Sequence, residues 1–205
     1  METLQISTLK ETIETSLDKS MSYSQYVELI ENLVIQNATT GNDKTQEQVE
    51  FTKLNERRVK RWNKTLKIAE ETQHKVKKYN KKTTWLVLTE SWCGDAAHIV
   101  PVINKVAELN SNINFRLVLR DENEGLMNKF LTNGGKAIPK LIALDEQNEV
   151  IGEFGSRPRI ATQLVEEYKR EYGMLTPEFK QDLQVWYNKD KGESTVEDLL
   201  GLLGH

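Results

Sequence analysis

Trp85-Leu86-Val87-Leu88, followed after three residues by Trp92-Cys93-Gly94-Asp95-Ala96, is the stretch that decides the fold of this 205-residue chain. The apolar run shows no polar alternation, which is typical of a central strand covered on both faces. A helix is expected from residue 96 to about residue 110, so the only cysteine, Cys93, falls where the strand gives way to the helix. Ala96 stands where a second cysteine would complete a C-x-x-C redox pair. The stretch therefore predicts a strand–helix unit with one thiol at its junction.

Strand and helix patterns alternate downstream of this unit. Residues 114–120 alternate and are rich in β-forming side chains, and Asp121 can cap a helix over residues 122–132. Residues 141–144 and 149–154 flank a turn and predict a hairpin, and a helix over residues 159–172 is expected to follow. The order βα-βα-ββα implies an α/β fold with parallel strands joined by helical crossovers and an antiparallel edge hairpin.

The amino-terminal part of the chain, residues 1–82, contains no proline and predicts helices throughout. Ser22 or Ser24 can cap a first helix, which the glycine-containing turn at residues 37–43 ends. A second helix is expected from Thr45 to Tyr79, because apolar residues recur there at spacings of three, four and seven. Such a helix would be roughly 50 Å long.

The carboxy-terminal part carries two further helix starts. Thr176-Pro177 places threonine at a cap and proline at the first helical position. Ser194 and Glu197 have the spacing of a capping box. We therefore predict a helical amino-terminal extension (1–82), an α/β domain (83–172) and a helical carboxy-terminal extension (173–205).

Composition excludes several classes of protein. The chain is 38% apolar, enough for a sizeable core, but no apolar stretch approaches the length of a membrane span. The first residues lack the basic region and hydrophobic core of a secretory signal, and one cysteine cannot form an internal disulfide. These features predict a cytoplasmic protein without a membrane partner.

Charge is unevenly distributed along the chain. Residues 43–82 carry 13 Lys or Arg against 6 Asp or Glu, although the whole chain has a net charge of −3. A basic segment of this kind can attract nucleic acid or an acidic partner. Interspersed acidic residues and the lack of a nucleic-acid motif instead favour a solvated helix packed against its own acidic domain. Nucleic acid is not expected as a partner.

Taken together, the motifs resemble the thioredoxin family. Trp92-Cys93-Gly94 lies at a strand-to-helix turn, and Ile138-Pro139 enters a strand about 45 residues later. The segments W-C-G-D, R-D-E-N (120–123) and T-N-G-G (132–135) are most similar to bacterial thioredoxin-like proteins. The resemblance covers residues 83–172. It implies a thioredoxin-like fold in which a cis Pro139 faces Cys93 across the site.

Physical chemistry favours a reactive thiol at this place. A cysteine at a helix amino terminus meets unpaired N–H groups and the positive end of the helix dipole, which stabilise the thiolate. We therefore expect partial exposure of Cys93 and a pKa below that of a free thiol. Gly94 lets another chain approach, Trp92 is expected to wall the site, and the backbone of Ile138 beside Pro139 is expected to pair with a substrate strand.

Three departures from the family pattern weaken ordinary dithiol chemistry. Ala96 removes the thiol that would resolve a mixed disulfide. Asp95 replaces the usual proline, and its charge would raise the pKa of Cys93. Val87 stands where many thioredoxins bury an aspartate that moves protons.

His98 with Cys93 and Asp95 suggests a metal site, but three ligands so close on one helix rarely converge. We expect neither a metal nor a cofactor.

The leading hypothesis is monothiol thiol–disulfide exchange in cell redox homeostasis. Cys93 would attack a protein disulfide or a small-thiol disulfide such as that of glutathione, and an external thiol reductant would resolve the adduct. As an enzyme, the chain would be a thiol–disulfide oxidoreductase without a resolving cysteine. The alternative is a redox-inert thioredoxin-fold module that binds a peptide or protein partner. A third hypothesis is an intermolecular Cys93–Cys93 disulfide dimer.

Overall fold

A four-stranded mixed sheet forms the centre of the chain. The computed structural model describes residues 2–204, and side chains from residue 9 onward. The strand order is β2-β1-β3-β4, with β1 parallel to β2 and the remaining pairs antiparallel. The strands are β1 (Thr83–Thr89), β2 (Ile113–Leu119), β3 (Lys140–Leu144) and β4 (Val150–Gly155). The predicted mixed α/β sheet with an antiparallel edge hairpin is therefore confirmed.

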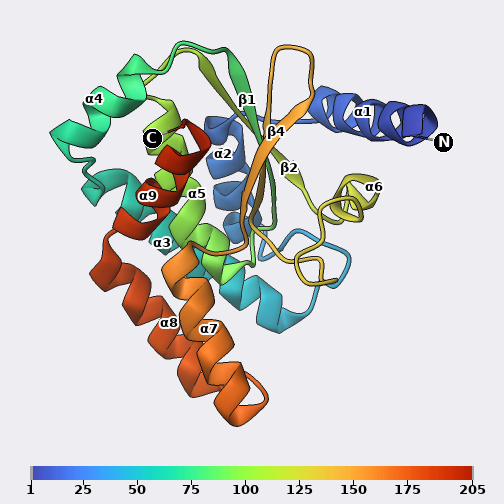
Figure 1. The fold of residues 1–205 in the computed structure, drawn as a ribbon. Helices are drawn as coiled ribbons and strands as arrows, with labels where there is room; N and C mark the ends of the chain where they lie inside the picture. Colours follow the sequence, from blue (N-terminus) through green and yellow to red (C-terminus); the bar gives the residue numbers. More distant parts are fainter. Residues whose placement is uncertain (1, 205) are drawn as a thin grey trace.

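Helices cover both faces of this sheet (Figure 1). On one side lie α3 (Gln46–Thr65), α5 (Gly94–Ala107) and α9 (Glu193–Leu202), and on the other lie α1 (Glu2–Asp18) and α6 (Glu124–Met127). Because apolar residues of β1 meet helices on both faces, Trp85, Leu86, Val87 and Leu88 are almost completely buried. The continuous apolar run of the sequence thus corresponds to a fully covered strand.

Further helices within residues 2–204 are α2 (Tyr23–Ile35), α4 (Glu70–Lys78), α7 (Arg159–Tyr172) and α8 (Pro177–Asp190). Ser22 caps α2 in a capping box, and Thr176 caps α8, as the sequence predicts. Just before α2, the backbone of Met21 exchanges two hydrogen bonds with Leu117 at the edge of β2. No helix within residues 2–204 has both the length and the apolar character needed to cross a membrane.

The expected continuous helix from Thr45 to Tyr79 is wrong, because the chain leaves the helical conformation between α3 and α4. Leu66 and Ala69 have extended backbone angles, with ψ of 128° and 144°. Ile68 packs against the core at this break, and Val76 of α4 is completely buried. An unbroken helix would carry its lysine-rich second half away from the domain, so tertiary contacts outweigh the helical periodicity.

Two cap predictions are also wrong. The helix expected over residues 122–132 is the single turn α6, and the side chain of Asp121 bonds instead to the N–H of Asn42 and to Arg120. Gly192 precedes α9, while Ser194 lies inside this helix and hydrogen-bonds Asp190. In both places a tertiary or neighbouring partner competes successfully for the capping side chain.

Candidate functional site

One edge of the sheet collects the loops that carry the sequence motifs. Because β1, β2 and β4 run in the same direction and β3 runs opposite to them, the ends of these three strands and the start of β3 share that edge. The loops there are 90–93, 120–123 and 156–158, together with Ile138-Pro139 before β3. Residues far apart in the sequence therefore meet around Cys93.

Cys93 is the cap of helix α5 and contacts the segment before β3. Its Sγ accepts a hydrogen bond from the N–H of Ala96 at 3.5 Å and donates one to the carbonyl oxygen of Ile138 at 3.4 Å. The Ile138–Pro139 peptide bond is cis. The structure thus brings Cys93, Ala96, Ile138 and Pro139 together.

The thiol of Cys93 is buried and protonated. Its residue is 8% exposed, and burial raises the pKa of Cys93 to about 12, helped by the negative charge of Asp95. The N–H groups of Ala96 and Asp95 and the charge of Arg157 lower this pKa by less. The expected partly exposed thiol with a lowered pKa is therefore wrong for this structure, because desolvation outweighs the helix terminus.

Asp95 is clamped by two residues from distant parts of the chain. Arg157 Nη2 lies 2.7 Å from Asp95 Oδ2, and the hydroxyl of Tyr187 donates to Asp95 Oδ1 at 2.9 Å. Burial raises the pKa of Asp95, although Arg157 and Tyr187 both oppose this rise by stabilising the carboxylate. The residue that replaces the usual proline is thus the acceptor that ties α8 and the loop after β4 to the site.

His98 continues this polar chain one turn further along α5. The indole N–H of Trp62 donates to His98 Nδ1 at 3.0 Å, and indole nitrogen is only a donor. The proton of the neutral imidazole therefore lies on Nε2, which donates to Gln184 Oε1 at 3.1 Å. Burial, with the charges of Arg58 and Arg61, lowers the pKa of His98 to about 3. Its ring also stacks on Tyr187, with centroids 4.7 Å apart.

Helix α8 lies directly over the first turn of α5. A Cβ atom added to Gly94 would stand 3.3 Å from Gln184 Oε1 and 3.5 Å from Arg58 Nη1. The open approach expected at Gly94 is therefore occupied by side chains of the same chain. Within residues 2–204, no group of three or more His, Cys, Asp or Glu side chains could hold a metal ion, and His98 serves in a hydrogen-bond chain.

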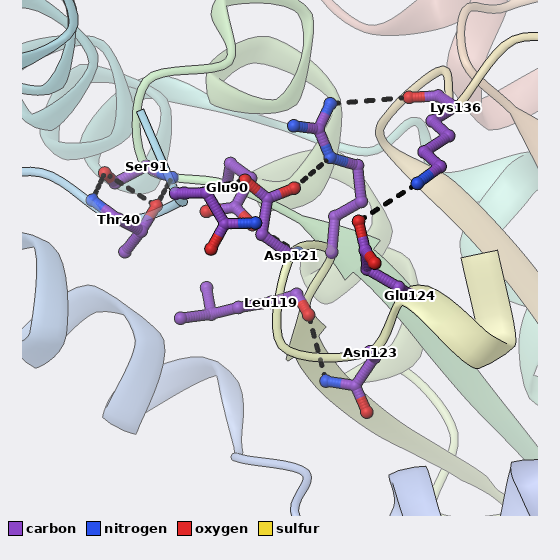
Figure 2. Close-up of polar contacts among 10 residues, drawn as sticks. Thr40, Glu90, Ser91, Leu119, Asp121, Asn123, Glu124 and Lys136 are labelled. Atoms are coloured by element: carbon purple, nitrogen blue, oxygen red, sulfur yellow. Dashed lines mark hydrogen bonds and ion pairs between the residues drawn. The ribbon is translucent and has the colours of Figure 1, made fainter. Parts of the chain in front are cut away.

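Trp92 lies on the other flank of the motif, against a second polar cluster. The Arg120 guanidinium stands 5.0 Å from the centre of the Trp92 ring, and Arg120 Nε bonds Asp121 Oδ1 at 2.6 Å. The N–H of Asp121 donates to Glu90 Oε1 at 2.9 Å (Figure 2). Gly41, at φ +89°, packs so closely that an added Cβ would lie 2.9 Å from Trp92 Nε1. This cluster fixes the ring of Trp92.

The amino-terminal segment is bonded to the motif through hydroxyl groups. The N–H of Ser91 donates to Thr40 Oγ1 at 2.8 Å, and the N–H of Thr40 donates to Ser91 Oγ at 3.1 Å (Figure 2). From α3, Thr52 Oγ1 lies 2.9 Å from Ser91 Oγ, and the Asn55 side chain donates to the carbonyl of Ser91 at 2.9 Å. Helix α3 therefore supports the turn that presents Cys93.

Sequence reasoning missed several residues that contact the site, among them Arg157, Gln184 and Tyr187. Arg157 follows β4, which ends at the same edge of the sheet as β1 but is separated from it by β3. The element order predicted from the sequence therefore gave only a general signal. Tyr187 is separated from Asp95 by 92 residues and lies in the last third of the chain. No motif or spacing in the sequence connects these two residues.

Comparison with known proteins gives a family and two structural neighbours. A family model described as thioredoxin matches residues 41–169, and a search of curated proteins finds no match. A crystal structure of a protein of unknown function from Pseudomonas aeruginosa is 19% identical, with a TM-score of 0.58 over 76% of this chain and 89% of the other. An HIV epitope scaffold is 17% identical, with a TM-score of 0.57 over 76% and 90%. These two likenesses concern the fold alone.

Proposed function

Because the chain belongs to the thioredoxin family, we propose that it takes part in thiol–disulfide exchange, with Cys93 as the single reacting thiol and the closed structure as the resting form. The observation that carries this proposal is the position of Sγ. It caps α5 and lies 3.4 Å from the carbonyl oxygen of Ile138, beside Pro139. The helix amino terminus supplies N–H groups that stabilise a thiolate once water reaches it.

The proposed reaction uses one thiol of this chain and one from outside. Deprotonated Sγ attacks one sulfur of a substrate disulfide, forms a mixed disulfide, and releases the other sulfur as a thiolate. An external thiolate then attacks the substrate-derived sulfur of the mixed disulfide and releases Cys93 as a thiolate, which takes up a proton. Because Ala96 carries no thiol, the second step needs a reductant from outside the chain. Candidate substrates are protein disulfides and small-thiol disulfides.

In the closed resting form, the attack of Cys93 on a substrate disulfide is slow. With a pKa of about 12, roughly one Cys93 in 10⁵ is ionised at pH 7. Exchange therefore requires the site to become hydrated, so that burial no longer disfavours the thiolate.

Glutathione disulfide tests the proposal directly. Wild-type protein should gain the mass of one glutathionyl group slowly, dithiothreitol should remove it, and Cys93→Ser should gain none. Ala96→Cys should gain insulin-reducing activity that the double variant Cys93→Ser/Ala96→Cys lacks, because the added thiol can resolve the adduct internally. A wild-type protein that stays unmodified at pH 8 after prolonged incubation would contradict the proposal.

A second candidate is a redox-inert binding module, and the raised pKa of Cys93 is the observation that supports it. In that case Cys93 is a buried cap of α5, and any partner binds equally well to the Cys93→Ser protein. Unchanged capture of the same partner by both proteins, together with no glutathione adduct on the wild type, would favour this candidate over exchange.

A further inference from the structure

Helix α8 is attached to the first turns of α5 by side-chain hydrogen bonds and by the stacking of Tyr187 on His98. Leu183 and Tyr187 of this helix are buried, and Phe179 and Trp186 pack partly buried against the core. Its ties to α5 are the hydrogen bonds from the Tyr187 hydroxyl to Asp95 and between Gln184 and His98. Most side chains of α8 are exposed or half-buried, and such a segment opens locally at a lower free-energy cost than the core. Helix α8 is therefore an element that can separate while the sheet stays folded.

Tyr187 lies within electrostatic range of Cys93 and connects α8 to Asp95, two residues after the cysteine. Burial raises the pKa of Tyr187, the charge of Asp95 raises it further, and the charge of Arg157 opposes this rise. The hydroxyl of Tyr187 donates to the Asp95 carboxylate, so loss of this contact leaves Arg157 as the remaining side-chain partner of Asp95 among the bonds described. A hydrogen bond to a charged group in a buried site is among the stronger single contacts in a protein.

We propose that helix α8 is an autoinhibitory cover over Cys93 and that the Tyr187 hydroxyl, bonded to Asp95, is its latch. The inference rests on the proposed function, because it describes how that same site is held inactive. When α8 opens, water reaches Cys93 and Asp95, which removes the desolvation of the thiol and screens the carboxylate charge. The N–H of Ala96 remains in place, because it belongs to α5. Opening therefore removes the burial that disfavours the thiolate and keeps the N–H group that stabilises it.

Tyr187→Phe isolates the latch, because it removes the hydroxyl and keeps a ring to stack on His98. Iodoacetamide alkylation of Cys93, followed by intact mass, measures how often the thiol becomes accessible. The rate should rise about 10- to 100-fold, as expected for loss of a hydrogen bond to a charged group. Tyr172→Phe is the matched control at an exposed tyrosine of α7 and should leave the rate unchanged.

Amide hydrogen exchange shows whether the opening is local. In Tyr187→Phe, protection should fall over residues 177–190 and stay unchanged in β1 and β3. A faster alkylation accompanied by equal loss of protection in the sheet would overturn the cover, since global unfolding would then expose the thiol. Unchanged alkylation would overturn it as well. If Tyr187→Phe does not fold, Gln184→Ala, which removes the tie to His98, is judged by the same two measurements.

The proposal of a cover and the proposal of an exchange reaction can be refuted independently. Alkylation by iodoacetamide does not involve a disulfide, so it reports the cover alone. If Tyr187→Phe is alkylated faster but gains no glutathionyl group from glutathione disulfide, the cover stands and the exchange proposal falls. If wild type and Tyr187→Phe gain the glutathionyl group at the same rate and are alkylated at the same rate, exchange stands and the cover falls.

Discussion

Lowering the pH from 7 to 4 should destabilise the chain by about 3 kcal/mol through His98 alone. The folded protein holds this imidazole neutral, with a pKa of about 3 caused by burial and by Arg58 and Arg61. In the unfolded chain the pKa returns to its ordinary value of 6.5. Between these values the unfolded state binds a proton that the folded state does not, so the free energy of unfolding decreases as the pH falls below 6.5. The slope is about 1.4 kcal/mol per pH unit.

The geometry explains why the folded state rejects the proton. His98 Nδ1 accepts from the indole N–H of Trp62, and a proton at this nitrogen would place two donors against each other. Nε2 already carries a hydrogen toward Gln184. Protonation would therefore break the contact with α3 as well as bury a charge.

Urea unfolding at pH 7, 6, 5 and 4 measures the effect when wild type is compared with His98→Asn. Carboxylates titrate in both proteins, so the difference between the two free energies of unfolding isolates His98. This difference should move by about 3 kcal/mol between pH 7 and pH 4, to the disadvantage of wild type. His74→Asn, at an exposed position of α4, is the matched control. Parallel curves for wild type and His98→Asn would refute the reasoning.

Three further predictions concern single substitutions around the site. Asp95→Asn removes the charge that opposes the thiolate, so the midpoint of the pH profile for Cys93 alkylation should fall by about one unit or more. Asp182→Asn, on the exposed face of α8, is the control and should leave this midpoint unchanged. An unchanged midpoint in Asp95→Asn would mean that burial alone sets the pKa of Cys93. Trp62→Phe leaves His98 Nδ1 without its donor and should reduce the free energy of unfolding by about 2 kcal/mol in urea titrations, whereas a neutral effect would contradict the described hydrogen bond. Gly41→Ala combines a strained φ of +89° with a contact 2.9 Å from Trp92 Nε1, and should lower stability by about 2–4 kcal/mol. Gly173→Ala, with φ of +77° and nothing within 4 Å, measures the backbone share of about 1–2 kcal/mol, and equal losses in the two variants would disprove the close packing at Gly41.

The sheet could be predicted from the sequence because its signals are local. The apolar run at β1, the alternation in β2 and the hairpin turn each lie within a few residues, and the order of elements then limits the topology. The break between α3 and α4 could not be predicted in this way. Leu66 and Ala69 continue the apolar stripe, and alanine favours helix, so the tertiary contacts of Ile68 and Val76 with the core outweigh the local signal.

The central residues of the candidate site could also be predicted from sequence motifs, whereas the residues that surround them could not. Cys93, Ile138 and Pro139 follow from motif and spacing, and the structure places Cys93 against the carbonyl of Ile138, the residue before Pro139. The direction of the pKa shift of Cys93 was predicted wrongly, because sequence shows the helix terminus but not what covers it. Gln184 and Tyr187, which bond to His98 and Asp95 beside the cysteine, come from α8, and no motif links α8 to the cysteine.

The substitution of aspartate for the usual proline has a structural consequence beyond its charge. Proline at position 95 would offer Tyr187 and Arg157 no acceptor, so α8 and the loop after β4 would lose their shared contact with the first turn of α5. Ala96 has a complementary consequence, because a mixed disulfide on Cys93 would persist until an external thiol arrived. A permanently exposed monothiol would collect such adducts from any disulfide in solution. In the proposed exchange, the carboxylate of Asp95 therefore makes adduct formation depend on opening of α8, which is the control that a site without a resolving thiol requires.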